Sequence, residues 1–149
     1  ISGKKAEAYK QTMADDEMII TADTIVYDNG KVLGKPRNRE EAVLMLHELS
    51  GHAHEVITGV SIVTKKKTVQ FASTSHVHFV ALTDAEIAYY VDEYKPFDKA
   101  GAYGIQEWIG FVAVTRIEGS YFNVMGLPIQ RLYTELKKFN KSPNGNQHS

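Results

Sequence analysis

The 149-residue chain contains no cysteine, only four prolines and no long hydrophobic run. Without cysteine it can form neither a disulfide framework nor a thiolate zinc site, and it cannot use a thiolate nucleophile. No apolar run approaches the roughly 18 residues needed to span a bilayer. The opening residues 1–5 (ISGKK) also lack the apolar segment of a signal peptide. These absences predict a cytoplasmic protein that does not engage a membrane.

The chain also lacks an excess of positive or negative charge. Lys plus Arg number 17 and Asp plus Glu 18, for a formal net charge of -1. This balance does not favour a nucleic-acid partner, although a few local cations would suffice to hold a small anion. Hydrophobic residues make up 43% and charged residues 23%, which is typical of a globular chain and not of a disordered one. The length favours one domain.

Hydrophobic periodicity predicts an α/β domain. Apolar runs or alternating patterns predict strands at 17–22, 25–27, 54–64, 68–82, 108–117 and 120–124. Helical spacing of apolar residues predicts helices at 3–13, 38–49, 83–94 and from Pro128 onward. Asn38 is expected to cap the second of these, and Thr83 with Glu86 to form a capping box at the start of the third. Asn29-Gly30 predicts a tight hairpin turn, because a type I′ turn needs positive φ at both central residues. The polar residues 140–149 are expected to form a disordered tail.

Asp23 is the first candidate for chemistry. We expect it at the C-terminal end of the apolar strand 17–22, the edge at which α/β sheets bind ligands. A carboxylate there can ligate a hard cation such as Mg²⁺ or accept a proton from water. The alternative is an aspartate that only forms a turn.

Two glycine-bearing loops supply further candidates. In Gly34-Lys35-Pro36, Lys35 could direct a point charge at a phosphate, although an isolated exposed lysine is commonly just solvated. In residues 98–106 (DKAGAYGIQ), the carboxamide of Gln106 could read the edge of a base, because one amide offers both a donor and an acceptor. The alternative for this second loop is a purely structural role around Tyr103.

The histidines are weaker candidates. His76 and His78 are two residues apart in a predicted strand, which is compatible with metal ligation, but the pattern supplies no third ligand. Solvent-facing strand residues are the favoured interpretation, and His52 and His54 at a helix–strand turn are similarly weak candidates for metal ligation. The chain also lacks Gly-x-Ser-x-Gly, Gly-x-Gly-x-x-Gly and P-loop patterns.

Taken together, five segments resemble the Maf family of nucleotide pyrophosphatases over nearly the whole chain, from Lys5 to about Leu136. Each segment is modest alone, but all five occur in the family's order. They are ADTIV (22–26), GKP (34–36) with EEA (40–42), LSGHAHEVITGV (49–60), DKAGAYGIQ (98–106) and IEGSYFNVMGLP (117–128). The resemblance implies a mixed twisted sheet flanked by helices, as in inosine triphosphate pyrophosphatase, with the Maf-like domain at 1–139.

The resemblance also implies an activity. The family hydrolyses nucleoside triphosphates between the α and β phosphates, with a divalent cation such as Mg²⁺ or Mn²⁺. Asp23 matches the family's catalytic proton acceptor, and its carboxylate is also a candidate metal ligand. Thr24 and Gln106 match positions associated with base selectivity, while Lys35 and Lys5 match lysines of the phosphate site and active site.

Segments 98–106 and 117–128 look like the branch of the family that acts on dTTP and UTP, with modified pyrimidine nucleotides as further candidates. The sister branch, which prefers 7-methyl-GTP, is an alternative. A nucleotide-binding regulator of cell division and septum formation without catalysis is another. The resemblance is also compatible with a homodimer, a common state in the family.

One departure from the family concerns the N-terminus. Family members begin with a strand and a Ser-x-Ser-Pro-Arg-Arg motif, followed by an acidic metal-site residue, and none of these is present. The first residue is Ile1 and not Met. We therefore expect an N-terminally incomplete family member whose phosphate-binding arginines lie outside this sequence.

Overall fold

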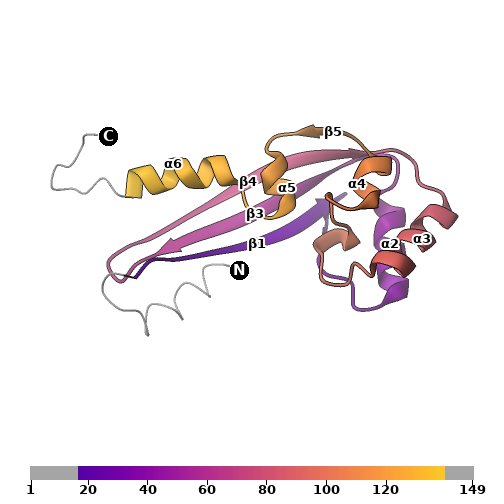
Figure 1. The fold of residues 1–149 in the computed structure, drawn as a ribbon, viewed down its shortest axis with the longest axis horizontal. Coiled ribbons are helices and arrows are strands. Elements are labelled where there is room, and N and C mark those ends of the chain that lie inside the picture. Colours follow the sequence, from indigo (N-terminus) through magenta and orange to yellow (C-terminus); the bar gives the residue numbers. More distant parts are fainter. Residues whose placement is uncertain (1–16, 140–149) are drawn as a thin grey trace.

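A five-stranded sheet with the order β2-β1-β3-β4-β5 organises the computed structural model, which describes residues 17–139 (Figure 1). The strands are β1 (Ile19–Asp28), β2 (Lys31–Leu33), β3 (Ala53–Val63), β4 (Thr68–Phe79) and β5 (Val114–Glu118). The helices are α2 (Arg39–Leu49), α3 (Asp84–Tyr94), α4 (Trp108–Ala113), α5 (Tyr121–Met125) and α6 (Ile129–Phe139), with a 3₁₀ turn η1 (Ala100–Ala102). The predicted helix 3–13 and the tail 140–149 lie outside the described residues.

The predicted α/β class with helices flanking a sheet is confirmed. All four strand pairs among residues 17–139 are antiparallel, so the parallel pair that a mixed sheet requires is not in the described part. No helix in this part of the chain is long and apolar enough to cross a membrane.

The first hairpin forms where the sequence predicts it. Asn29 and Gly30 have φ values of 51° and 83°, and Asp28 pairs with Lys31. The two short strands predicted before this turn are instead one strand, because β1 pairs with β3 without a break from Ile19 to Tyr27. The expectation that Asp23 ends a strand is therefore wrong: it lies within the ladder, opposite Gly59.

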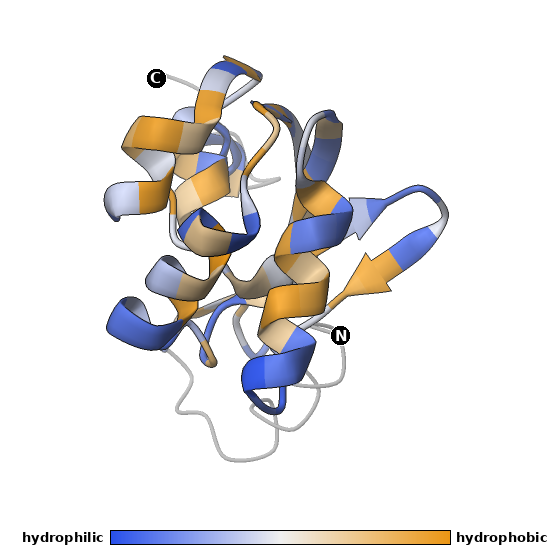
Figure 2. Cartoon of the chain, turned by 90° about the vertical axis from the view of Figure 1, so that its right-hand side faces the viewer, coloured by the Kyte–Doolittle hydropathy of each residue, from blue (hydrophilic) through white to orange (hydrophobic). Residues whose placement is uncertain are grey.

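The two helices α2 and α3 begin at the caps that the sequence predicts. The Asn38 side chain accepts a hydrogen bond from the backbone N–H of Glu41 at 2.9 Å. Thr83 and Glu86 form a reciprocal capping box at the start of α3. Both helices gather at one end of the sheet, and Figure 2 shows hydrophobic and hydrophilic residues interspersed along the helices there, as expected for helices with one buried face.

The strand predictions for 108–117 and 120–124 are wrong in large part. Residues 108–113 form α4, and only 114–118 form a strand. Helix α4 packs so closely on the preceding loop that a Cβ on Gly110 would lie 1.8 Å from the Ile105 carbonyl oxygen. Residues 121–125 form α5, because the Ser120 side chain accepts from the Asn123 backbone N–H and caps a helical turn.

The two larger hydrophobic clusters of residues 17–139 stabilise the fold. The larger one joins the sheet to α2 and α3, with Leu46, Leu49, Ile87 and Tyr90 fully buried. The smaller one lies where Leu132 of α6 packs against Val60 and Ile62 of β3. In Figure 1, α6 runs along the far end of β3 and β4, away from α2 and α3.

Candidate active site

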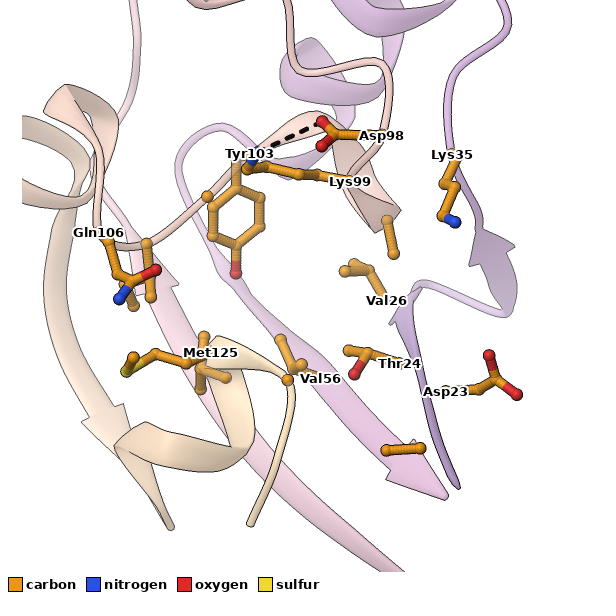
Figure 3. Close-up of a pocket in the computed structure, with 16 residues that line it drawn as sticks. Asp23, Thr24, Val26, Lys35, Val56, Asp98, Lys99, Tyr103, Gln106 and Met125 are labelled. Atoms are coloured by element: carbon orange, nitrogen blue, oxygen red, sulfur yellow. Dashed lines mark hydrogen bonds and ion pairs between the residues drawn. The ribbon is translucent and has the colours of Figure 1, made fainter. Parts of the chain in front are cut away.

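The candidate site is a cavity of about 290 Å³ at the surface of β1. Alternate residues of a strand share one face, so Ala22, Thr24 and Val26 form its floor together with Val56 of β3. Its walls come from Lys35, from residues 98–106 and from the C-terminal end of α5. The cavity thus joins segments that are far apart in the sequence (Figure 3).

The first hairpin places Lys35 beside the floor. The Asn29-Gly30 turn folds β2 back onto β1, and Lys35 follows two residues after β2 ends. The Gly34 carbonyl accepts a hydrogen bond from the Gly101 N–H at 3.1 Å, which ties this segment to the loop 98–106. Lys35 is exposed, and its charge adds, after the larger effect of Lys99, to the lowering of the pKa of Asp98.

A close approach of the loop 98–106 to β1 requires glycine. Gly101 has a φ of +70°, and a Cβ there would lie 2.7 Å from Cγ2 of Val26. Next to it, Lys99 forms ion pairs with Asp98 at 3.3 Å and with Glu107 at 3.9 Å. The hydrogen bond from Lys99 is the largest cause that lowers the pKa of Asp98 below its ordinary value. The result is a second cation fixed at the cavity wall.

Tyr90 of α3 holds the end of this loop. Its hydroxyl donates to Glu107 Oε1 at 2.5 Å and accepts from the Gly104 N–H at 3.0 Å. Burial and then the bond to Glu107 raise the pKa of Tyr90, so the hydroxyl keeps its proton. The stretch that ends in Gln106 is therefore anchored to a fully buried core residue.

On its buried side, the loop 98–106 contacts a histidine through Tyr103. His54 Nε2 lies 2.6 Å from the Tyr103 hydroxyl, and both side chains are buried. Burial lowers the pKa of His54 to about 4, so its ring is neutral at pH 7. Burial also raises the pKa of Tyr103. Both rings make edge contacts with Phe79, which holds Tyr103 against the cavity.

The opposite wall depends on Asn123, which is fully buried in α5. Its side-chain amide donates to the carbonyl oxygens of Val56 and Ser73, both at 3.1 Å. These bonds attach the five-residue helix to β3 and β4. They place Met125 and Gly126, which follow Asn123 closely in the chain, at the cavity.

The structure brings together four of the five predicted site residues. Asp23, Thr24, Lys35 and Gln106 all line the cavity. In Figure 3, Asp23 and Lys35 lie toward one side and Gln106 toward the opposite side, with Thr24 between them. The fifth residue, Lys5, lies outside the described residues.

Other lining residues were not predicted as site residues. Lys99 and Tyr103 lie in the loop that was singled out, and the Asp98-Lys99 pair was the available signal for a second cation. Met125 lies in the segment 117–128 that resembles the family, but no local pattern marks it as a site residue, and its attachment through Asn123 brings it to the cavity.

His52, His76 and His78 each contact a carboxylate in the described part of the chain. His76 and His78 pair with Glu55 at 3.2 Å and Glu118 at 2.9 Å, as solvent-facing strand residues can. His52 instead bonds the buried carboxylate of Asp28 at 2.9 Å, and this bond raises the pKa of His52. Within residues 17–139, no group of three or more His, Cys, Asp or Glu side chains could hold a metal ion by itself.

Cationic and anionic groups lie toward one side of the cavity and a carboxamide toward the other, an arrangement that suits a small, charged organic ligand. Comparison with known proteins gives the family. The model of the Maf-like protein family matches residues 1–139, and the chain therefore belongs to that family.

Curated relatives cover most of the chain. A protein named dTTP/UTP pyrophosphatase from Parabacteroides distasonis is 64% identical over 139 residues, which is 93% of this chain and 72% of the relative. Proteins with the same name from Phocaeicola vulgatus and Porphyromonas gingivalis are 59% and 55% identical. They too match 93% of this chain, over 72% and 70% of their own lengths respectively.

Proposed function

We propose that this protein hydrolyses dTTP and UTP between the α and β phosphates, releasing the nucleoside monophosphate and pyrophosphate. The observation that carries the proposal is that Asp23, Thr24, Lys35 and Gln106 line one cavity. The activity in the names of relatives at 55–64% identity supports the same conclusion.

The layout of the cavity suggests how a nucleotide lies in it. The triphosphate would occupy the side of Asp23 and Lys35, where Lys35 and Lys99 offset its charge. The base would then lie toward Gln106, Thr24 and Met125. Gln106 is exposed at the cavity, where its carboxamide can offer both a donor and an acceptor to a base edge.

The reaction needs an activated water. In the proposed step, a water oxygen forms a bond to the α phosphorus while the bond from that phosphorus to the bridging oxygen breaks. Asp23 accepts the proton of the water, and pyrophosphate leaves with the bridging oxygen. Lys35 and Lys99 stabilise the charge on the phosphate oxygens.

The carboxylates of the cavity also suit a divalent cation. Mg²⁺ is commonly held by one or two carboxylates together with substrate phosphates, and Asp23 and Asp98 both line the cavity. We propose Asp23 as the residue that would hold it. When bound, such a cation neutralises phosphate charge. A single oxygen of Asp23 would not easily serve both as the ligand of that cation and as the proton acceptor.

Replacing the proton acceptor tests the proposal. Asp23→Asn should lower pyrophosphate release from UTP by at least about a hundredfold, the lower range for a lost general base. Asp84→Asn is the matched control, because Asp84 is an exposed aspartate at the start of α3 that does not line the cavity. Near wild-type turnover by Asp23→Asn would remove Asp23 from the mechanism.

A substrate panel separates the alternatives. UTP and dTTP should release pyrophosphate faster than 7-methyl-GTP in the presence of Mg²⁺ or Mn²⁺. Binding of UTP without pyrophosphate release would instead favour a nucleotide-binding regulator. A preference for 7-methyl-GTP would place the protein in the sister branch.

A further inference from the structure

Three groups form a line of hydrogen bonds that begins at Thr24 in the cavity floor and continues into the interior. The Thr24 hydroxyl oxygen lies 2.8 Å from that of Thr58, its partner on β3. The Thr58 hydroxyl oxygen lies 3.2 Å from the backbone carbonyl oxygen of Asn123. Thr58 and Asn123 are fully buried, whereas Thr24 is half-buried and lines the cavity. The line therefore runs from the interior to the ligand side.

The direction of the protons along this line follows from counting hydrogens. A threonine hydroxyl has one hydrogen, and a carbonyl oxygen can only accept. The contact between Thr58 and the Asn123 carbonyl holds a hydrogen only if Thr58 donates it. Thr58 then has no hydrogen left for Thr24, so the hydroxyl of Thr24 must donate to Thr58.

The opposite direction leaves a buried contact without a hydrogen. If Thr58 donated to Thr24, its oxygen would face the Asn123 carbonyl oxygen at 3.2 Å with nothing between them. A buried polar contact of this kind is unfavourable. The Asn123 carbonyl also accepts from the Gly126 N–H at 3.0 Å, so in the favoured direction both of its lone pairs are used.

We propose that Thr58 is a positioning residue that makes Thr24 an obligate hydrogen-bond acceptor toward the cavity. With its only hydrogen given to Thr58, the Thr24 oxygen presents lone pairs alone to a ligand. This inference rests on the proposed function, because it assumes that the base of the substrate lies against Thr24. It also specifies which hydrogen-bonding group of the base Thr24 selects.

That feature is a ring N–H donor. Uracil and thymine carry a hydrogen on N3, whereas N3 of cytosine is a lone-pair acceptor. An acceptor-only Thr24 can bond the first type and faces the second with two lone pairs opposed. Sites that hydrogen-bond a substrate group discriminate strongly against an analogue in which that group is missing. Thr58 thereby contributes to a preference for UTP over CTP without touching the nucleotide.

A pair of substitutions at Thr58 tests the proposal. Thr58→Val keeps the shape of the side chain but removes the hydroxyl, which frees the Thr24 hydrogen to turn toward the cavity. The UTP-to-CTP ratio of kcat/KM should then fall by about tenfold, the equivalent of one hydrogen bond. Thr58→Ser keeps the hydroxyl and should keep the wild-type ratio.

The controls separate this role from a structural one. Loss of stability alone would lower UTP and CTP turnover together and leave the ratio unchanged, and circular dichroism reports the fold of each variant. An unchanged ratio in folded Thr58→Val, or an equal shift in Thr58→Val and Thr58→Ser, would overturn the proposal.

Wild-type protein gives a second test that does not depend on folding of a variant. UTP methylated at N3 lacks the hydrogen that Thr24 would accept, so its kcat/KM should be at least about tenfold below that of UTP. Equal turnover of the two nucleotides would overturn the role of Thr24 and Thr58 while leaving the pyrophosphatase activity in place. A wild type that releases no pyrophosphate from UTP would overturn the proposed function and this inference with it.

Discussion

The buried histidine beneath the cavity makes a sharp prediction about acid stability. His54 is 2% exposed, and burial lowers its pKa to about 4 from an ordinary value of 6.5. The perturbation is His54→Gln, which does not titrate and whose carboxamide can reach the Tyr103 hydroxyl much as Nε2 does.

The sign of the effect follows from proton linkage. Between pH 6.5 and 4 the unfolded chain protonates His54 while the folded protein does not, so protons favour unfolding. The contribution of His54 to the free energy of unfolding therefore falls as pH falls through this window. Between pH 7 and pH 4.5 the loss amounts to about 2 kcal/mol, at roughly 1.4 kcal/mol for each unit of pKa difference.

Urea unfolding at the two pH values measures this loss. Trp108, the single tryptophan, reports unfolding by fluorescence. Wild type should lose about 2 kcal/mol more than His54→Gln on acidification. His52, whose pKa is raised by Asp28, has the opposite pH dependence but is present in both proteins, so it cancels in the comparison. Equal losses in the two proteins would refute the burial of a neutral His54.

Three further predictions concern the walls of the cavity. Gly101→Ala should lower the free energy of unfolding by about 1–3 kcal/mol in urea titrations, because the new Cβ would meet Val26 at a positive φ; an unchanged midpoint would contradict the close approach. Asn123→Ala should cost at least about 2 kcal/mol in the same assay, since it removes the hydrogen bonds of a fully buried amide to two strand carbonyl oxygens, and a loss below about 0.5 kcal/mol would count against these bonds. Gln106→Ala should change the ranking of UTP against GTP in pyrophosphate release while leaving the thermal midpoint within about 2 °C, as expected for a surface substitution; an unchanged ranking would remove Gln106 from the base site.

Local signals predicted much of the fold. The Asn29-Gly30 turn and the caps at Asn38 and Thr83 were correct because short-range chemistry decides each of them. Residues 108–113 were misassigned because their aromatic and branched side chains favour a strand, whereas in the structure they form a helix that packs through Gly110 against Ile105. The Ser120 cap was a readable helix signal that the apolar run in 121–125 outweighed.

The site was harder to predict than the elements. Asp23, Lys35 and Gln106 could be named from their own segments and from the family resemblance. That they share a cavity depends on long-range contacts, such as the bond between Gly34 and Gly101. His54 contacts Tyr103, which is 49 positions away in the chain, and Asn123 bonds Val56, which is 67 positions away. No local sequence pattern encodes such pairings.

The two walls of the cavity have separate origins, and this matters for how the protein could diversify. Asp23 and Lys35 belong to the first hairpin region, whereas Gln106 and Met125 belong to two later segments with independent anchors in Tyr90 and Asn123. Substitutions at Gln106 or Met125 therefore leave those anchors and the proposed hydrolytic groups untouched. One scaffold can thus acquire a preference for a different nucleobase by small steps, without passing through forms that have lost the ability to cleave the triphosphate.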